Sequence, residues 1–324
     1  MPRLRTALTD LLGIEHPILL APMAAISGGR LAAAVTEAGG LGLLGGGYAD
    51  PRWVDPAFHE AGNGRVGIGF ITWALDRQPE ALARALAHRP AAVMLSFGDP
   101  GTHVAAIKEA GARLICQVQR LEEAEQAAAL GADVIVAQGQ DGGGHGRVGR
   151  GTLGFVRAAV EAVAPVPVVA AGGIGDGRGL AAALMLGAAG VLMGTRFYAA
   201  EEAVAPQAVK QALAEGRGDD TVFTGVFDRV RGPEWPGGYG GHALRNALTE
   251  RWRGRESELA GAVLEAEREA YRRADEADDL SSRVVWAGEA VDLIRESLPA
   301  SEIVRRTVSE AAAVLSVAPR FVVS

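Results

Sequence analysis

Cysteine is almost absent from this chain, because Cys116 is the only one among 324 residues. A single cysteine excludes an intramolecular disulfide framework and a metal site built from several thiolates. Cys116 falls within an expected strand, where most cysteines are packed core residues, so a covalent thiol mechanism is disfavoured. Apart from His145, the histidines are scattered without the close spacing of metal ligands: His16, His59, His88, His103 and His242. We therefore expect no metal site.

Lysine is also scarce, since Lys108 and Lys210 are the only two. Both are expected on outer helices, which argues against an aldolase that needs a Schiff-base lysine in its active site. A net charge of −7 argues against a nucleic-acid partner that binds a basic face. No apolar run approaches membrane-spanning length, and residues 1–10 lack the apolar core of a signal peptide. We expect a cytoplasmic protein with no membrane partner.

What the chain does contain is a regular alternation of apolar strands and helices. Strands are predicted at residues 18–21, 41–44, 66–71, 92–97, 114–118, 134–136, 166–171 and 190–193. Helices are predicted after them at residues 28–38, 51–61, 79–87, 100–110, 121–130, 152–163, 177–186 and 206–215. Eight strand-then-helix units predict an α/β fold, the (β/α)8 TIM barrel. An open doubly wound sheet would carry a glycine fingerprint after its first strand, where this chain has Pro22-Met23.

Polar residues and glycines gather at the carboxyl ends of these strands, where a TIM barrel builds its active site. They are Met23, glycines 45–47, Thr72, Gln117, Gln138, His145, Gly172-Gly173 and Gly194-Thr195. The glycines after the seventh and eighth strands coincide with the usual phosphate site of the fold, although simple tight turns would look the same. Because both turns are present, the sequence favours a phosphorylated ligand.

Residues 133–147 join the sixth strand to a glycine-rich loop that contains His145. Glycines allow close approach of the backbone to a ligand, and a histidine titrates near neutral pH. A flexible loop with an idle histidine is the alternative, and Asp141 could either approach His145 or cap a turn. Few other charged groups are expected at the rim. The pattern favours a phosphate-bearing cofactor that performs the chemistry while the protein orients the reactants.

Several motifs in a fixed order carry a resemblance to a known family. They are Pro17-Ile18, Ala21-Pro22-Met23, and the segments 32–35, 38–42, 139–146, 171–174, 176–179 and 193–197. On these motifs the chain resembles the nitronate monooxygenase (2-nitropropane dioxygenase) family of FMN-dependent barrels, from Gly13 to Phe197 and weakly beyond. The same superfamily contains the enoyl-acyl carrier protein reductase II enzymes and some NAD(P)H:quinone reductases.

The resemblance implies FMN as the cofactor. The segment that lies against the flavin ring is matched by Ala21, Pro22 and Met23. Other cofactor contacts are implied for Gln117, Gln138, Gly143 and Gly144, and a phosphate cradle for Gly172, Gly173, Gly194 and Thr195. His145 matches the catalytic histidine beside the flavin, which orients a nitronate or removes a proton from a neutral nitroalkane. Substrate contacts are expected from Gly69, Thr72, Trp235 and Tyr239.

The activity that the resemblance implies is oxidation of an alkyl nitronate with O2 to a carbonyl compound and nitrite. Two segments depart from the family: residues 141–145 read Asp-Gly-Gly-Gly-His for Glu-Ala-Gly-Gly-His, and residues 67–69 read Gly-Ile-Gly for Gly-Val-Asn. A tyrosine and lysine pattern of one monooxygenase class is missing, and residues 243–246 resemble the reductase-like branch. The alternatives are an NAD(P)H-dependent flavin reductase, of the enoyl reductase II or quinone reductase kind, a flavin-free phosphosugar isomerase and an FMN-binding sensor. A homodimer is compatible with the sequence.

Composition shifts after the eighth predicted helix. We expect an FMN-binding barrel at residues 1–218, a helical lid at 219–280 that contacts substrate, and helices at 281–324 that pack back on the barrel. Within these regions residues 219–241 are expected to be irregular, and helices are predicted at 243–252, 256–274, 282–298 and 301–315, the last capped by Ser301. Packing within the helical layer is the alternative role for Trp235, Tyr239 and Trp286.

Overall fold

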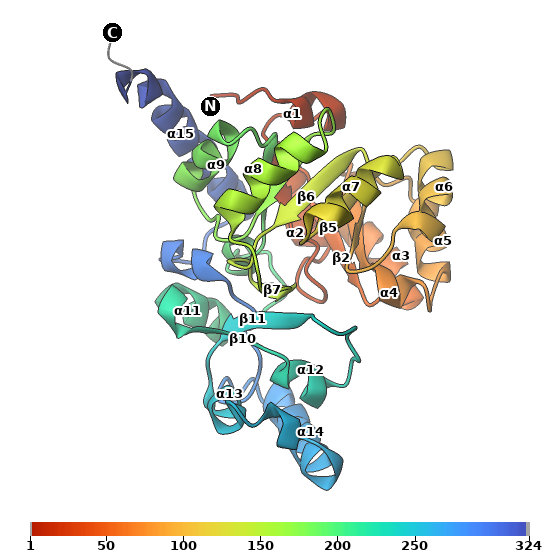
Figure 1. Ribbon diagram of the computed structural model, residues 1–324, viewed down its shortest axis with the longest axis vertical. Coiled ribbons are helices and arrows are strands. Elements are labelled where there is room, and N and C mark those ends of the chain that lie inside the picture. Colours follow the sequence, from red (N-terminus) through yellow and green to blue (C-terminus); the bar gives the residue numbers. More distant parts are fainter. Residues whose placement is uncertain (1, 322–324) are drawn as a thin grey trace.

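The computed structural model describes residues 2–321 and contains an eight-stranded parallel barrel (Figure 1). Its strands are β1 Ile18–Leu20, β2 Leu43–Gly47, β3 Gly67–Ile71, β4 Ala92–Ser96, β5 Arg113–Val118, β6 Val134–Gln138, β8 Val168–Ala171 and β9 Gly190–Met193. They are ordered β1-β9-β8-β6-β5-β4-β3-β2. A parallel bridge between Leu19 and Leu41, just before β2, joins the two ends of the sheet. The predicted TIM barrel is confirmed.

Helices surround the barrel in the expected order. The outer ring consists of α2 Gly29–Glu37, α3 Pro51–Ala61, α5 Glu80–Ala87, α6 Gly101–Glu109, α7 Leu121–Ala129, α8 Thr152–Ala162, α9 Gly177–Met185 and α11 Gln207–Glu215. Shorter helices are α1 Ala7–Leu12, α4 Thr72–Leu75 and α10 Thr195–Tyr198. No helix among residues 2–321 is both long and apolar enough to cross a membrane.

The strands are mostly apolar because both of their faces are buried. One layer fills the barrel interior with side chains such as Leu43, Met94 and Val136, and Leu8 of α1 belongs to the same cluster. The other layer lies between the strands and the outer helices. A packed interior leaves the strand ends as the place where a ligand can enter.

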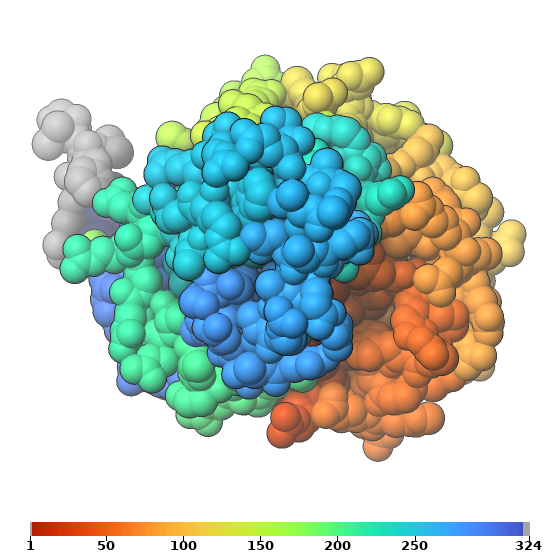
Figure 2. Space-filling view, turned by 90° about the horizontal axis from the view of Figure 1, so that it is seen from below, coloured from red at the N-terminus to blue at the C-terminus, as the bar shows by residue number. Residues whose placement is uncertain are grey.

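The chain after α11 builds a cap over the carboxyl ends of the strands (Figures 1 and 2). Its elements are η1 Gly218–Asp220, β10 Thr221–Thr224, α12 Val226–Arg231, β11 Gly240–Leu244, α13 Ala247–Trp252, η2 Glu256–Glu258 and α14 Gly261–Glu276. The cap has its own apolar core, in which Phe227, Trp252 and Tyr271 are buried. The remaining elements are η3 Glu289–Leu293, α15 Ala300–Val317 and η4 Ala318–Phe321. Helix α15 packs on α9, where Glu310 accepts a hydrogen bond from the Gly177 N–H at 2.9 Å.

A small antiparallel sheet joins the cap to the barrel. The loop after β6 forms a short strand, β7 Gly144–Gly146, and the sheet is ordered β10-β11-β7. His145 stands opposite Gly241 in this sheet. A Cβ at Gly241 would lie 2.2 Å from the ring of Trp286, so glycine leaves room for that indole. The cap therefore holds the loop that carries His145 in place.

Several expectations for the cap were wrong. Residues 219–241 contain β10 and α12 instead of being irregular, and residues 243–244 belong to β11 instead of a helix. Residues 282–298 contain only η3, because their backbone bonds to other segments: Leu244 N–H donates to Val285, and Glu289 N–H donates to Asp141. Helix α15 is preceded by Pro299, and Ser301 lies inside it, so Ser301 is not its cap.

Candidate functional site

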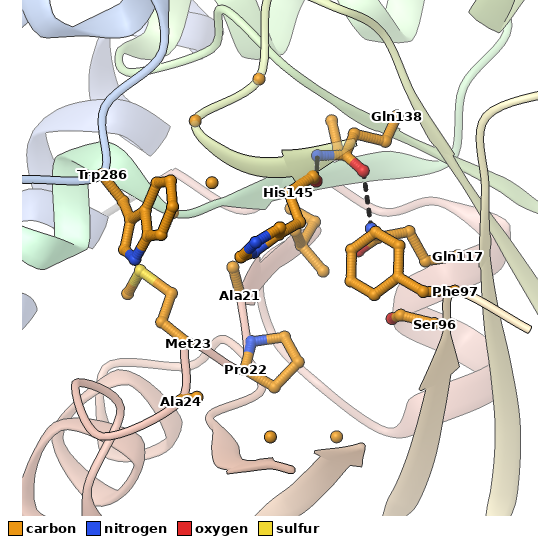
Figure 3. A pocket seen from close by; sticks show the side chains of 18 of the residues that line it. Ala21, Pro22, Met23, Ala24, Ser96, Phe97, Gln117, Gln138, His145 and Trp286 are labelled. Carbon is orange, nitrogen blue, oxygen red and sulfur yellow. Dashed lines mark hydrogen bonds between the residues drawn. The ribbon is translucent and has the colours of Figure 1, made fainter. Parts of the chain in front are cut away.

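A cavity lies between the barrel and the cap, and it encloses about 1160 Å³ of empty space including its open mouth. Its walls come from the carboxyl ends of the barrel strands and from α12, Trp235 and Trp286. In Figure 3 the imidazole of His145 lies between the rings of Trp286 and Phe97. The wall combines apolar and aromatic side chains with a few polar groups, which is typical of a small-molecule site.

The floor of the cavity is the segment Ala21, Pro22 and Met23, which follows β1. Ser27 fixes it, because its hydroxyl donates to the Ala21 carbonyl at 2.8 Å and accepts from the Met23 N–H at 3.2 Å. Gly69 lies against this segment, since a Cβ there would be 2.3 Å from the Pro22 ring. No side chain fits at Gly69 without moving the floor.

Unpaired backbone N–H groups occur on residues that line the cavity where β8 and β9 end. Within residues 2–321 the N–H groups of Gly172, Gly173 and Thr195 donate to no protein acceptor, and all three residues line the cavity. The φ angles of Gly172 and Gly173 are +109° and +68°, which favour glycine. Gly194 also lines the cavity between these N–H groups and Met23. The donors form a concave cradle that suits a phosphate group.

Glutamine side chains hold the loop that carries His145. Gln117 and Gln119 both donate to the Gln138 side-chain oxygen, at 2.6 and 2.8 Å. Gln138 in turn donates to the His145 carbonyl at 3.0 Å. The side-chain amide of Gln138 is therefore used within the protein, whereas the Gln117 oxygen makes no hydrogen bond among the described residues. Of the two glutamines that line the cavity, Gln117 and Gln138, Gln117 is thus the one with an acceptor left for a ligand.

Close packing fixes the same loop from the other side. A Cβ at Gly143 would lie 2.5 Å from the Gly288 nitrogen, and Gly288 N–H donates to the Thr195 hydroxyl at 3.2 Å. Gly144 has a φ of +71°. Asp141 accepts from the Thr152 N–H at 2.7 Å, so its carboxylate holds the start of α8 instead of contacting His145.

His145 pairs with a carboxylate of the cap. Its Nε2 lies 2.7 Å from Asp228 Oδ1, and the two side chains are 11% and 9% exposed. Trp235 stacks flat on the imidazole, with ring centroids 3.7 Å apart and an interplanar angle of 8°. Trp286 contacts the same ring at 4.8 Å. The imidazole is therefore held in one orientation.

Two expected substrate residues lie away from the cavity wall. Thr72 starts α4 and is fully buried, with a hydroxyl that has no partner among the described residues. The Tyr239 ring lies under the Arg147 guanidinium, 3.9 Å from it. Gly69 and Trp235 do line the cavity. The indole N–H of Trp235 donates to the Tyr48 hydroxyl at 3.2 Å.

Four residues of the site were missed by the sequence reasoning: Tyr48, Phe97, Asp228 and Arg231. Tyr48 and Phe97 follow β2 and β4 directly, so their place at strand ends could have indicated them. Arg231 is the only lysine or arginine on the wall within the described chain, and it makes no ion pair there. Burial raises the pKa of the Tyr48 hydroxyl, with the charge of Arg231 opposing that shift.

Groups set aside on sequence grounds lie outside the cavity. Lys108 pairs with Asp133 at 2.6 Å, and Lys210 donates to the Glu201 carbonyl at 2.8 Å. Cys116 is buried in the layer between strands and helices. Among residues 2–321 no group of three or more histidine, cysteine, aspartate or glutamate side chains could hold a metal ion.

Comparisons with known proteins place this architecture in a family. The nitronate monooxygenase family model matches residues 5–61 and 70–310, and the interval between them contains the departure at residues 67–69. A nitronate monooxygenase of Neurospora crassa is 34% identical, with 92% of this chain and 89% of that protein covered.

Solved structures agree with the sequence comparison. FabK from Thermotoga maritima is 31% identical with a TM-score of 0.86, covering 98% of this chain and all of that one. Nitroalkane oxidase from Streptomyces ansochromogenes is 28% identical with a TM-score of 0.82, covering 96% of this chain and 99% of that one. The family match spans most of the sequence, so this oxidoreductase belongs to the nitronate monooxygenase family.

Proposed function

We propose that this chain oxidises alkyl nitronates with O2, with FMN as its cofactor. In the overall reaction two nitronate anions and one O2 give two carbonyl compounds and two nitrite ions, so that each oxygen atom of O2 ends in a carbonyl group. The observation that carries the proposal is the cavity itself. It combines a cradle of free N–H groups, a floor of Ala21–Met23 and a wall with His145 and Arg231.

The enzymes of the nitronate monooxygenase family use a flavin, and we propose that the flavin of this chain is FMN. The cradle at Gly172, Gly173 and Thr195 offers donors for one terminal phosphate. Gln117 has a side-chain oxygen left for a polar group of the cofactor. When bound, FMN would supply the electron acceptor that the side chains of this site lack.

The residues of the chain bind and orient the nitronate. Arg231 contributes the positive charge on the wall, which favours an anionic substrate over a neutral one. As the imidazolium, His145 would donate from Nδ1 to the nitro oxygens and hold them electrostatically. The aromatic side chains Trp235, Trp286 and Phe97 exclude water and strengthen these charge interactions.

An anaerobic absorbance spectrum tests this proposal. The purified protein should be yellow after incubation with FMN, and an alkyl nitronate should bleach the flavin band without O2. Admitting O2 should restore the band and release nitrite. A colourless protein that takes up no FMN would remove the cofactor, and a yellow protein that ignores nitronate would remove the substrate.

An NAD(P)H-dependent reductase of the enoyl reductase II kind is the second candidate. FabK is such a reductase, and the similarity to it covers 98% of this chain and all of that one. The discriminating measurement is the same anaerobic spectrum with NADH or NADPH in place of nitronate. Rapid bleaching by a nicotinamide, with none by nitronate, would transfer the assignment to this candidate.

The roles of Thr72 and Tyr239 and the division into regions 1–218, 219–280 and 281–324 stay predictions. We propose that Thr72 and Tyr239 support the wall from behind, because Tyr239 packs against both Trp235 and Phe97. A separate lid region is supported by the apolar core around Phe227 and Trp252. A homodimer and a cytoplasmic location also stay predictions.

A further inference from the structure

We propose that Asp228 is a positioning residue that makes His145 Nδ1 the base for neutral nitroalkanes. The inference rests on the proposed function and extends it to a second substrate form. Asp228 belongs to α12 of the cap, whereas His145 belongs to the loop after β6 of the barrel. The cap would therefore supply the residue that orients the catalytic histidine of the barrel.

The hydrogen bond decides which nitrogen of His145 carries a proton. An ionised carboxylate only accepts hydrogen bonds, so the contact of 2.7 Å with Asp228 Oδ1 requires a proton on Nε2. In the neutral imidazole the lone pair then lies on Nδ1. Nδ1 makes no hydrogen bond within residues 2–321, and it is not sealed from the cavity that His145 lines. Nδ1 is therefore the free base of the site.

The orientation of the His145 ring is fixed by its packing and by the contact with Asp228. Trp235 covers one face at 3.7 Å, and Trp286 contacts the ring at 4.8 Å. The backbone of His145 is held by pairing with Gly241 and by the hydrogen bond from Gln138. Turning the ring over would move Nε2 away from Asp228 and leave a mostly buried carboxylate unpaired, which is costly.

The charges around the pair suit proton removal from carbon. The ionisable side chains that share the cavity wall with His145 are Arg231 and Tyr48, and burial raises the pKa of Tyr48, so its hydroxyl stays neutral. His242, on the strand next to β7, bonds to the Thr221 hydroxyl at 2.9 Å instead. Arg231 therefore supplies the positive charge at the wall, and Asp228 the negative charge behind the imidazole.

The proposed step is balanced without any oxidant. The C–H bond next to the nitro group breaks, its electron pair moves into the nitro group to form the nitronate anion, and the proton binds Nδ1. The resulting imidazolium is stabilised by Asp228, and it returns the proton to water after turnover. The nitronate formed in place then enters the proposed oxidation.

The first experiment compares neutral nitroethane with preformed ethylnitronate on the FMN-loaded protein. The variants are Asp228→Asn, Asp228→Glu and the control Asp219→Asn, whose exposed side chain makes no hydrogen bond in the described structure. We expect Asp228→Asn to lower kcat/KM for nitroethane about 10²–10⁴-fold, with ethylnitronate affected less than about tenfold. Nitroethane deuterated next to the nitro group should react more slowly with the wild type. Equal losses on both substrates, or unchanged turnover of nitroethane, would overturn the proposal.

A spectroscopic measurement keeps the inference testable if Asp228→Asn folds poorly. Nitrogen-15 NMR of histidine-labelled wild-type protein should show neutral His145 with a proton on Nε2 and none on Nδ1. Asp228→Glu should keep that tautomer, and Asp228→Asn should change it. A proton on Nδ1 in the wild type would refute the role of Asp228 directly. By contrast, a wild type with the expected tautomer that oxidises neither substrate would refute the proposed function alone.

Discussion

The close contact between Gly143 and Gly288 gives a prediction whose size can be worked from the structure. A Cβ at Gly143 would lie 2.5 Å from the Gly288 nitrogen, 2.8 Å from the Ala287 carbonyl carbon and 2.8 Å from the Thr195 hydroxyl. Two of these atoms are backbone, so the strain cannot be relieved by a side-chain rotation. We therefore expect Gly143→Ala to push the segment of Gly288 away from the barrel.

The expected cost has two parts. Overpacking at a tight site costs about 1–3 kcal/mol. Separating the segments also weakens the hydrogen bonds from Gly288 N–H to Thr195 and from Glu289 N–H to Asp141, each worth about 0.5–1.5 kcal/mol. The sum predicts a loss of about 2–6 kcal/mol in the free energy of unfolding. Because Thr195 belongs to the proposed phosphate cradle, FMN affinity should fall as well.

Urea unfolding with and without FMN measures both effects. The matched control is Gly154→Ala, since Gly154 lies in α8 and a Cβ there would meet no atom within 4 Å. That control should gain about 0.5–1 kcal/mol, because alanine favours a helix more than glycine does. If Gly143→Ala unfolds within about 0.5 kcal/mol of the wild type and binds FMN equally well, the packing argument is wrong.

Three further predictions follow from single side chains. His145→Asn should lower kcat for nitronate about 10²–10³-fold while FMN stays bound; full activity would remove its assigned role, and the flavin spectrum checks the loading. Arg231→Leu should raise KM for nitronate about tenfold with little change in kcat, most clearly at low salt; an equal effect from Arg253→Leu, an exposed cap arginine, would show that only general charge matters. Burial raises the pKa of Cys116 from 9.0 to about 12, so its stabilising contribution is present below pH 9 and is lost as pH approaches 12. A thiol reagent at pH 8 should leave Cys116 unmodified until urea unfolds the chain; modification of the native protein would contradict its burial.

The barrel could be predicted from the sequence because its signals are local. Each strand is a short apolar run, and glycines follow many of them, so strands and helices were placed within a few residues of their bounds. The rim position of His145, Gln117 and the glycines 172–173 follows from that order alone. Thr72 shows the limit of this reasoning, because the chain turns into α4 at once and buries the side chain.

The cap could not be predicted because its structure depends on distant partners. Strand β7 consists of two glycines around His145, a composition with no strand propensity, and it forms only because β11 pairs with it. Asp228 lies in a segment rich in glycine, proline and charge, 83 residues from its partner His145. No local pattern could have joined these two residues.

This division between barrel and cap has a consequence for how the chemistry can vary. The cradle, the floor and the glutamines come from the barrel, whereas Asp228, Arg231 and Trp235 come from one short helix of the cap and the loop after it. Substitutions in the cap can therefore change which substrate is bound and which proton is removed without disturbing the proposed cofactor site. The similarity to FabK and to nitroalkane oxidase covers 98% and 96% of this chain, so it includes the cap. Because Arg231 and Trp235 line the cavity, substitutions in α12 and at Trp235 are the first test of which residues select the substrate of this chain.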